Sequence, residues 1–478
     1  MSLWRKLACL GTLIVTDVLT LFLIFQAGFF FRDSVFSSLP IFRKPPVPLD
    51  VQLGSGFAAG AVILVLIFAS LKLYSRRFSF WEETRLLVEG VTLAFLVIMT
   101  MIFLARSHTR FSRTVIVVGW VLSIVVFPLE RLLIKKLLAR SGLWRKNILI
   151  LGTGQTAQKV AREIRRDKSL GLTIVGFLSE RRNQVGRSLA DGIPVVGVIG
   201  DLRRLITALD ARDVVVSLSR GKQNRVLGIA KSCEHLVENI KIVPETGSDY
   251  TSGVRVEELR DIITLSLPRN LSKPWNKVIK NTFDLSLGFV FLLLASPFLV
   301  LIAAAVKIDS PGPAFFTQKR LGRRGKEFRM IKFRSMHRDA PQRLAAHFRN
   351  RPEARREWNK YQKLKGEDPR VTRVGRFLRS SSLDELPQIL NVLFGDMSLV
   401  GPRPYLPREK SRLGPVREFI RRVRPGLTGL WQVRGRNRLS FRDRLALDEY
   451  YIRNWSLWLD IVILLQTVKV VIRREGAF

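Results

Sequence analysis

The chain begins with a series of long apolar stretches. They cover residues 7–31, 53–73, 86–105 and 114–133, and each has about the 20 residues that a helix needs to cross a bilayer. Buried helices of a soluble protein are the alternative, but four such stretches in succession rarely occur in a soluble core. The first stretch is too long for an ordinary signal peptide and lacks a small-residue cleavage site. We therefore predict a four-helix transmembrane region over residues 1–140.

Basic residues set the expected orientation of these helices. The densest basic cluster follows the fourth stretch and comprises Arg131, Lys135, Lys136, Arg140, Arg145 and Lys146. By the positive-inside rule this end of the helix faces the cytoplasm. An even number of crossings then places the N-terminus on the cytoplasmic side as well.

From Asn147 onward, short apolar runs alternate with helical patterns. Strand candidates cover residues 147–151, 172–178, 211–218 and 239–243, and a helix is expected between the first two, ending near Arg166. Alternation of strands and helices is typical of a doubly wound sheet. We expect an α/β Rossmann-like middle domain over residues 147–262.

The turn after the first of these strands carries a dinucleotide-binding pattern. Gly152, Gly154 and Ala157 fit the GxGxxG/A fingerprint, in which glycines let a phosphate approach a helix N-terminus. Glu180, after the second strand, is placed to hold a ribose hydroxyl. The alternative is a Rossmann-like scaffold with an empty pocket, because no Tyr-x-x-x-Lys pair accompanies the fingerprint in this segment. The fingerprint supports the fold more strongly than it supports a ligand.

A fifth apolar stretch covers residues 285–306 and is interrupted at Ser296-Pro297. Proline removes a backbone donor and kinks a helix. Basic residues flank both ends, so a simple crossing would place one basic flank and the whole C-terminal region outside the cell. We therefore prefer a re-entrant helix, at about residues 283–306, that bends at Ser296-Pro297 and returns to the cytoplasmic face.

Composition excludes several classes of protein. The 478 residues are 47% hydrophobic, which excludes a disordered chain, and two cysteines exclude a disulfide scaffold. The four histidines show no metal-ligand spacing, which argues against a zinc site. Lys and Arg number 79 against 39 Asp and Glu, a net charge of +40.

More than half of this excess charge lies in the last 206 residues. From Lys273 onward there are 42 Lys and Arg against 18 Asp and Glu. Nucleic acid, anionic membrane lipid and phosphate-bearing substrates are the partners that such charge attracts. No nucleic-acid-binding motif is present, so we expect lipid and phosphate rather than nucleic acid. Near the C-terminus, Tyr451, Trp455 and Trp458 fit either a core or an interfacial helix equally well.

One acidic pair stands out in this basic region. Ser382 and Glu385 have the spacing of a capping box, and Asp384 with Glu385 then lies at a helix start. Helix capping alone is one interpretation. The other is chemical: the helix dipole keeps Asp384 ionised, an ionised aspartate attacks phosphorus, and the adjacent glutamate holds Mg²⁺. Arg379 lies five residues upstream and offers a phosphate-binding guanidinium.

The surrounding motifs carry a family resemblance. They read KFRSM from Lys332, SLDELPQ from Ser382, GDMSLVGPRP from Gly395, RPGLTG from Arg424 and GRN from Gly435. Together they resemble the polyprenyl-phosphate hexose-1-phosphate transferases, the monotopic phosphoglycosyl transferases also called bacterial sugar transferases. The resemblance covers residues 273–478. The whole chain resembles the large members of that family.

The resemblance implies a mechanism and a set of residues. Asp384 would be the nucleophile that attacks a UDP-hexose, releases UMP and passes hexose-1-phosphate to undecaprenyl phosphate, with galactose favoured and glucose as the alternative. Glu385 would support Mg²⁺. The phosphate ligands would be Lys332, Arg334, Arg379, Arg403 and Arg436. The implied catalytic domain is an α+β fold with the re-entrant helix, on the cytoplasmic face of the bacterial inner membrane.

Two functions of other classes remain. One is a membrane-tethered nucleotide-sensing scaffold that uses Gly152 to Ala157 for a ligand and the basic domain for lipid. The other is an NAD-dependent sugar-nucleotide dehydratase or epimerase, and the absence of a Tyr-x-x-x-Lys pair from the middle segment argues against it. UMP release from a UDP-sugar separates the transferase from the scaffold. We also expect a homodimer.

Overall fold

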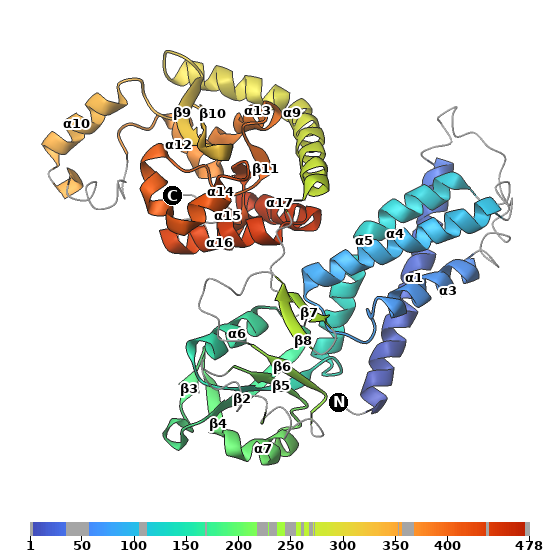
Figure 1. The fold of residues 1–478 in the computed structure, drawn as a ribbon. Coiled ribbons are helices and arrows are strands. Elements are labelled where there is room, and N and C mark those ends of the chain that lie inside the picture. Colours follow the sequence, from blue (N-terminus) through green and yellow to red (C-terminus); the bar gives the residue numbers. More distant parts are fainter. Residues whose placement is uncertain are drawn as a thin grey trace. The chain divides into compact units, whose positions relative to one another are not determined.

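The structure is a computed structural model (Figure 1). It describes residues 3–34, 57–104, 112–167, 170–217, 228, 237–243, 255–259, 262–266, 271, 273–351, 353–355, 368–435 and 439–473. The chain divides into two compact units, Met1–Thr246 and Gly247–Phe478. Each unit is described by itself.

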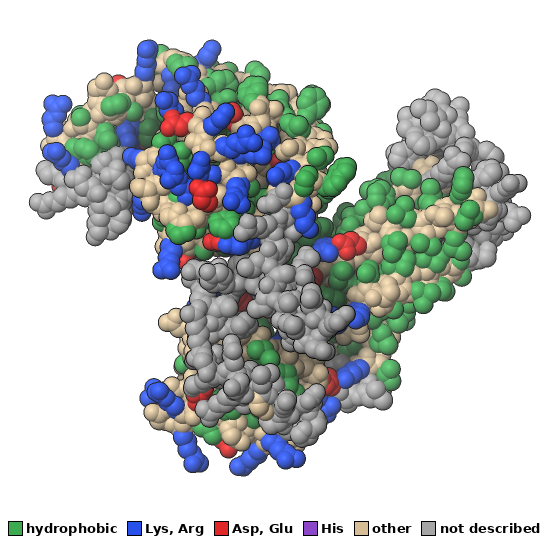
Figure 2. Space-filling model, in the orientation of Figure 1, with side chains coloured by type: hydrophobic (Ala, Val, Ile, Leu, Met, Phe, Trp, Pro, Cys, Tyr) green, Lys and Arg blue, Asp and Glu red, His purple; other side chains and the backbone are tan. Residues whose placement is uncertain are grey.

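Apolar helices form the first part of unit one. They are α1 (Leu3–Ser34), α3 (Phe57–Ser70), α4 (Phe80–Leu104) and α5 (Arg113–Arg140). Of these, α1, α4 and α5 are long and apolar enough to cross a membrane. Their outward side chains are hydrophobic, as the green surface over this bundle in Figure 2 shows. The predicted N-terminal apolar helices are thus confirmed.

The second predicted span ends earlier than expected, and its first residues, 53–56, lie outside the described residues. Within the described residues α3 has 14 residues, about 21 Å of helix, against the roughly 30 Å of a hydrocarbon core. The helix ends because Lys72 adopts a left-handed backbone conformation (φ 61°). Leu73, which we expected at the end of the span, instead lies fully buried after the turn. A run of apolar residues alone does not reveal this break.

Charged side chains are buried between these helices. Arg131 of α5 donates to Asp17 of α1 at 2.7 Å, and Tyr74 donates to the same carboxylate at 2.8 Å. One helical turn further along α5, Lys135 lies 2.6 Å from Glu83 of α4. Such pairs satisfy groups that would otherwise be very unfavourable in an apolar bundle. They lock α1, α4 and α5 together.

The middle of unit one is a six-stranded mixed sheet in the order β3-β4-β2-β1-β5-β6. Only the edge pair β3 and β4 is antiparallel; the other pairs are parallel. The strands are β1 (Lys146–Leu151), β2 (Leu172–Ser179), β3 (Ser188–Leu189), β4 (Ile193–Val198), β5 (Asp213–Val216) and β6 (Asn239–Ile242). The Rossmann-like fold is confirmed, although β3 and β4 were missing from our strand candidates.

Alternation along β1 explains how the sheet is covered. Ile148 and Ile150 pack with α6 (Gln155–Arg166), whereas Leu149 and Leu151 pack with α7 (Leu202–Ala208) on the other face. Successive side chains of a strand point to opposite faces, so a continuously apolar strand requires helices on both. Two short 3₁₀ turns, η5 (Arg182–Gln184) and η6 (Ile199–Asp201), complete this part.

Unit two is a helical domain with short two-stranded sheets. Its strand pairs are β7 (Arg255–Leu259) with β8 (Ile262–Ser266), β9 (Phe315–Leu321) with β10 (Glu327–Phe333), and β11 (Ser398–Val400) with β12 (Gly426–Thr428). Its helices are α9 (Pro274–Asp309), α10 (Ala340–Asn350), α12 (Arg373–Ser381), α13 (Gln388–Leu393), α14 (Arg417–Ile420), α15 (Leu430–Arg434), α16 (Phe441–Asn454) and α17 (Leu457–Ile472), with 3₁₀ turns η8 (Arg323–Gly325), η9 (Leu383–Glu385) and η10 (Pro407–Val416).

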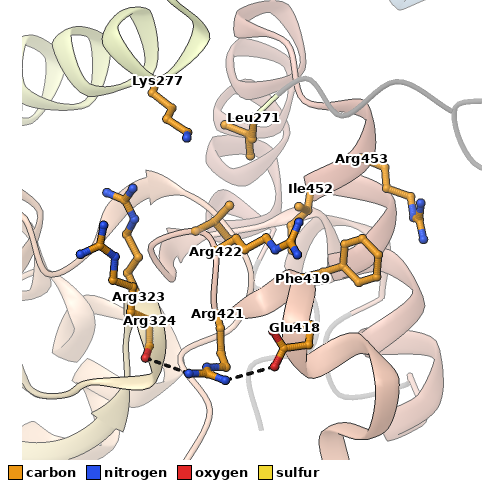
Figure 3. A pocket seen from close by; sticks show the side chains of 11 residues that line it. Leu271, Lys277, Arg323, Arg324, Glu418, Phe419, Arg421, Arg422, Ile452 and Arg453 are labelled. Carbon is orange, nitrogen blue, oxygen red and sulfur yellow. Dashed lines mark hydrogen bonds and ion pairs between the residues drawn. The ribbon is translucent and has the colours of Figure 1, made fainter. Parts of the chain in front are cut away.

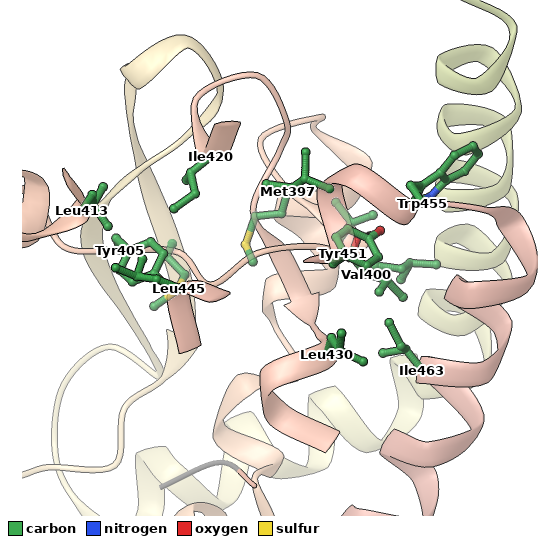
Figure 4. Packing of buried hydrophobic residues seen from close by; sticks show 14 of the residues in the cluster. Met397, Val400, Tyr405, Leu413, Ile420, Leu430, Leu445, Tyr451, Trp455 and Ile463 are labelled. Carbon is green, nitrogen blue, oxygen red and sulfur yellow. Dashed lines mark hydrogen bonds between the residues drawn. The ribbon is translucent and has the colours of Figure 1, made fainter. Parts of the chain in front are cut away.

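One main hydrophobic core holds these elements together (Figure 4). It joins residues from β11, α15, α16 and α17, among them Val400, Leu430 and Ile463. Tyr451 and Trp455 are 1% and 3% exposed and belong to it. The core alternative therefore holds for these two aromatic residues.

Helix α9 is longer than the predicted apolar stretch and is bent (Figure 1). Pro297 lies inside it and cannot donate to the carbonyl of Leu293, four residues earlier. The Ser296 hydroxyl donates to that carbonyl at 2.8 Å. The Ser-Pro pair therefore supplies both the kink and the replacement hydrogen bond, as the expected bend requires.

A buried polar network fixes the first turns of α9. Lys280 donates to Asp284 at 3.0 Å and to Asp460 of α17 at 2.7 Å. Ser398 of β11 donates to Asp284, and Tyr451 donates to Asp460, both at 2.7 Å. Each carboxylate that accepts from Lys280 therefore has a second hydrogen-bond donor inside the domain. Buried charges are stable only when they are paired and hydrogen-bonded in this way.

Candidate active site

The Asp384-Glu385 pair lies in η9, directly after α12. Ser382 ends α12 in a left-handed conformation (φ 59°), and its side chain makes no capping hydrogen bond to the turn that follows. The predicted capping box is therefore wrong, because the chain reverses at Ser382 before the acidic pair. A single 3₁₀ turn follows, in which the Glu385 N–H donates to the Ser382 carbonyl at 3.3 Å.

Burial dominates the electrostatics of Asp384. It raises the pKa of this carboxyl to about 6, with Glu385 adding to the rise and the cations of Lys332 and Arg379 opposing it. Burial, which the sequence argument from the helix dipole did not include, is therefore the main influence on this carboxyl. At neutral pH the carboxyl is still mainly ionised, and it is less solvated than a surface aspartate, which makes it a stronger nucleophile.

Lys332 of β10 contacts the neighbouring carboxylate. Its ammonium group lies 2.6 Å from Glu385 Oε1, and both side chains are part-buried. The residue therefore places one positive charge beside two carboxylates. This contact brings the KFRSM and SLDELPQ motifs together at one site.

Arg379 reaches the same site from α12. Its Nε donates to the Ser335 hydroxyl at 3.0 Å, and burial lowers the pKa of its guanidinium. The approach of α12 depends on Gly375, because a Cβ there would collide with the Ser335 carbonyl. Gly375 thus lets α12, and with it Arg379, lie close against the Ser335 backbone.

The hydrophobic residues on both sides of the acidic pair pack against α9. Leu383 and Leu386 pack in a cluster with Val306 of α9, Phe333 of β10 and Leu378 of α12. The second arm of α9 also meets α12 through Asp309, which accepts from the Val374 N–H at 3.0 Å. The candidate nucleophile therefore lies against the end of an apolar, membrane-type helix.

Arg334 has a different environment from the one predicted for a phosphate ligand. Its side chain is buried, and Nη1 donates to the Pro311 carbonyl at 2.9 Å. Nη2 donates to the carbonyls of Ser310 and Val306. The Ser310 and Pro311 carbonyls lie just after the end of α9, and the Val306 carbonyl in its last turn also accepts from the Ser310 N–H. Arg334 caps α9 and ties it to β10.

Arg403 belongs to a second basic cluster around Trp431. The guanidinium carbons of Arg403 and Arg444 lie 5.2 and 5.5 Å from the Trp431 ring centre. Burial, together with the charge of Arg403, lowers the pKa of Arg320 to about 10, and Glu385 acts on Arg320 in the opposite sense. Guanidinium groups that lie near enough to lower one another's pKa indicate a binding site for an anion.

A buried carboxylate accepts hydrogen bonds from the segment that carries Arg403. Asp448 of α16 accepts from the Tyr405 hydroxyl at 2.8 Å and from the Arg403 N–H at 3.1 Å. Burial raises its pKa to about 7. Asp448 thus holds the Gly-Pro-Arg-Pro segment in place. Arg320, Arg444, Trp431 and Asp448 were not predicted from the sequence, since only folding brings β9, α15 and α16 together.

The remaining predicted residues lie elsewhere. Arg436 lies outside the described residues. In unit one, Gly152 has φ 110°, Gly154 is the N-cap of α6, and Ala157 is fully buried against the sheet. The glycines and the alanine thus have the backbone and packing roles of the fingerprint. Glu180 follows β2 and is exposed.

The donor set at the acidic pair suits a hard cation. Within the described residues, no group of three or more His, Cys, Asp or Glu side chains forms a ready-made metal cage. Mg²⁺ in phosphate chemistry takes one or two carboxylates together with substrate phosphate oxygens. Asp384 and Glu385 supply adjacent oxygen donors. Burial, and to a smaller extent the charge of Glu385, raises the pKa of Asp384, and a bound cation would oppose both effects. The residues therefore fit Mg²⁺.

Comparisons with known proteins add family information. Residues 275–474 match the family model described as bacterial sugar transferase, and residues 73–244 match the one described as CoA-binding domain. An undecaprenyl-phosphate galactose phosphotransferase of Salmonella typhimurium is 34% identical over 91% of this chain and 90% of its own length.

Two further relatives match smaller parts of this chain. An undecaprenyl-phosphate glucose phosphotransferase of Komagataeibacter xylinus is 33% identical over 70% of this chain and 60% of its own length. The exopolysaccharide production protein ExoY of Rhizobium meliloti is 44% identical over 43% of this chain and 91% of its own. Galactose and glucose names thus occur at nearly equal identity.

Proposed function

Because this chain belongs to the bacterial sugar transferase family, we propose that it transfers hexose-1-phosphate from a UDP-hexose to undecaprenyl phosphate. The products are undecaprenyl-diphospho-hexose and UMP. The reaction is the first membrane step in the synthesis of an O-antigen, a capsule or an exopolysaccharide. The observation that carries the proposal is the partly desolvated Asp384, flanked by Lys332 and Arg379 and seated on α9.

In the first step an ionised Asp384 oxygen attacks the phosphorus that bears the hexose. An oxygen–phosphorus bond to Asp384 forms, the bond from that phosphorus to the bridging oxygen breaks, and UMP leaves with the bridging oxygen. In the second step an oxygen of undecaprenyl phosphate attacks the same phosphorus. The bond to Asp384 breaks and the carboxylate is regenerated, so atoms and charge balance over the cycle.

Cationic side chains support both steps. Lys332 and Arg379 offset charge on the phosphoryl oxygens, and the Arg403 cluster binds the second phosphate of the nucleotide. Glu385, with Asp384, would hold Mg²⁺, and the cation would supply positive charge to offset the charge on the leaving UMP. Arg436 was predicted for the same phosphate role.

The bend of α9 supports a re-entrant placement. With 36 residues, about 54 Å of helix, α9 is longer than one crossing requires, and its kink carries an internal hydrogen bond. Entry and exit on the cytoplasmic face of the inner membrane would keep Asp384 beside the cytoplasmic nucleotide sugar. The lipid acceptor would then approach along the second arm of α9.

Galactose is the favoured sugar. The support is the galactose-named relative, which aligns with more of this chain than the glucose-named one does. A panel of UDP-sugars with undecaprenyl phosphate, read as UMP release, decides between UDP-galactose and UDP-glucose. UMP release from neither would favour the membrane-tethered scaffold. Light scattering of the detergent-purified protein tests the homodimer.

The nucleophile is tested by Asp384→Asn in the full-length protein. An amide cannot attack phosphorus, so we expect UMP release to fall by about 10³-fold or more. Brief incubation of wild type with UDP-hexose alone should add the mass of hexose-1-phosphate to the peptide that contains Asp384. Asp339→Asn changes an exposed aspartate of the same domain and should leave the rate unchanged. Normal UMP release by Asp384→Asn would overturn the assignment.

The metal is tested separately. EDTA should abolish UMP release, and added Mg²⁺ should restore it. Glu385→Gln should raise the Mg²⁺ concentration that gives half-maximal rate. Full activity in the chelator would contradict a metal at Glu385.

A further inference from the structure

A second, strongly basic cavity lies beside the start of α9. It has a volume of about 450 Å³, and among the described residues that line it Glu418 is the only one with a carboxylate (Figure 3). The cationic residues of its lining are Lys277, Arg323, Arg324, Arg421, Arg422 and Arg453. Such an excess of positive charge attracts an anion with several oxygens.

Most of this charge has no internal counter-charge. Arg421 pairs with Glu418 at 3.1 Å, and Arg453 pairs with Glu449 at 2.6 Å. Within the part of the chain that the structure describes, Lys277, Arg323 and Arg422 make no ion pair. Three cations that converge on one cavity without carboxylate partners are arranged for an external anion rather than for stability.

The backbone that carries these side chains is fixed in an unusual conformation. Arg324 is left-handed (φ 60°), and its N–H donates to the Arg421 carbonyl at 2.6 Å. The Arg421 guanidinium in turn donates to the Arg324 carbonyl at 3.4 Å. A non-glycine residue in this region is strained, and such strain is often found where a turn presents groups to a ligand. The turn η8 is thus locked to α14.

Apolar surface adjoins the cavity on α9. Trp275, Val278 and Ile279 on the first turns of the helix are 78%, 53% and 44% exposed. Lys277 extends from the same turns into the cavity that Arg323 and Arg324 also line (Figure 3). An exposed tryptophan beside aliphatic residues and lysine is typical of the headgroup level of a membrane. An occupant with a phosphate in the cavity could lay its hydrocarbon along this face.

The cavity is separate from the Asp384 site. Arg323 and Arg324 lie in the turn between β9 and β10, whereas Lys332 lies near the other end of β10. The five residue-to-residue steps from Glu327 to Lys332 span roughly 17 Å of strand. Asp384, Glu385, Lys332 and Arg379 do not line the cavity.

We propose that the cavity formed by Lys277, Arg323 and Arg422 binds the phosphate headgroup of a membrane lipid, outside the transfer site. The lipid's hydrocarbon lies along the exposed first turns of α9. The lipid is either an anionic phospholipid or a polyprenyl phosphate, because both present the same phosphate oxygens. The bound headgroup fixes the depth at which the first arm of α9 sits.

The test measures lipid binding to the full-length protein in detergent by native mass spectrometry. Phosphatidylglycerol, undecaprenyl phosphate, phosphatidylcholine and inorganic phosphate are titrated in separate arms. The wild type should bind at least one of the two anionic lipids about tenfold or more tightly than phosphatidylcholine. Arg323→Glu with Arg422→Glu should lose that preference. Arg349→Glu with Arg351→Glu reverses two exposed charges near α10 and should keep it.

Each outcome bears on the proposal. Preference for phosphatidylglycerol identifies a phospholipid, and preference for undecaprenyl phosphate identifies the acceptor lipid; either supports the site. An unchanged preference in the Arg323/Arg422 variant would overturn it, as would binding of inorganic phosphate as tight as that of both lipids. Arg323→Gln with Arg422→Gln, a milder change, guards against misfolding and should weaken binding in the same direction. Asp384→Asn should keep the lipid preference while losing UMP release, so failure of the transfer mechanism and failure of this site are distinguishable.

Discussion

Lys332 and Glu385 form an ion pair of 2.6 Å across 53 residues of sequence, beside the candidate nucleophile. The two partners act on the Asp384 carboxyl in opposite directions: Lys332 lowers its pKa and Glu385 raises it. Each charge of the pair can therefore be tested through its effect on Asp384.

Removal of the two charges should move the acidic limb of the pH–rate profile in opposite directions. Lys332→Met withdraws a cation and should shift that limb to higher pH, whereas Glu385→Gln withdraws an anion and should shift it lower. Both variants should also be slower, because Lys332 and Glu385 contact phosphate or metal. The measurement is single-turnover UMP release between pH 5 and 8 at saturating Mg²⁺. Shifts in the same direction would contradict the arrangement.

In the wild type the same profile should follow the raised pKa of Asp384. Only the ionised carboxylate attacks, so kcat/KM should fall about tenfold per pH unit below about pH 6 and level off above it. A rate that stays constant down to pH 4.5 would show that the free carboxyl has an ordinary pKa.

The raised pKa also predicts an effect on stability. An unfolded aspartate ionises near 3.8, and the folded one near 6. The folded protein therefore binds more protons between these values, and the contribution of Asp384 to the unfolding free energy declines as pH rises through about 6. Asp384→Asn should accordingly have a higher Tm than the wild type at pH 7.5 and a smaller difference at pH 4.5. A lower Tm at pH 7.5 would contradict the burial of this charge.

Gly375 should be intolerant of any side chain. Gly375→Ala introduces a Cβ that collides with the Ser335 carbonyl, so α12 must move and Arg379 must leave Ser335. We expect a loss of about 1–3 kcal/mol of unfolding free energy and a larger loss of kcat than of substrate affinity. Gly200→Ala is the matched control, because nothing lies within 4 Å of its added Cβ. Wild-type kcat in Gly375→Ala would show that α12 need not approach so closely.

The topology of α9 is tested by labelling. With Cys9 and Cys233 replaced, single cysteines at Lys273 and Lys307 should react with an impermeant maleimide from the same, cytoplasmic side of membrane vesicles. Ser296→Ala with Pro297→Leu removes the kink and its hydrogen bond, and should move one label to the opposite side. Labelling of the two wild-type positions from opposite sides would disprove the re-entrant helix.

The sequence predicted the elements with strong local signals. The apolar helices, the strands around Gly152 and the Ser-Pro bend follow from composition, periodicity and backbone chemistry at neighbouring positions. The break after α3 escaped detection, since it depends on the left-handed Lys72. At the site, the grouping of Lys332, Arg379 and Asp384 came from motif resemblance.

The rest of the site depends on long-range packing. Arg334 lies only two residues after Lys332, yet it donates to carbonyls at the end of α9, because β10 ends at Phe333 and Arg334 lies beyond the strand. The pKa of Asp384 could not be predicted either. It depends on burial by Leu383, Leu386 and the end of α9, and no local pattern encodes that burial.

The contact between Asp17 and Arg131 has a consequence for biosynthesis. The two residues are 114 positions apart, so α1 is made long before its counter-charge. Until α5 emerges from the ribosome, α1 carries an aspartate with no cation to compensate it in lipid. The first helix should therefore wait at the insertion machinery and enter the bilayer together with the last one. A nascent chain truncated before α5 would then be a substrate for membrane quality-control proteases.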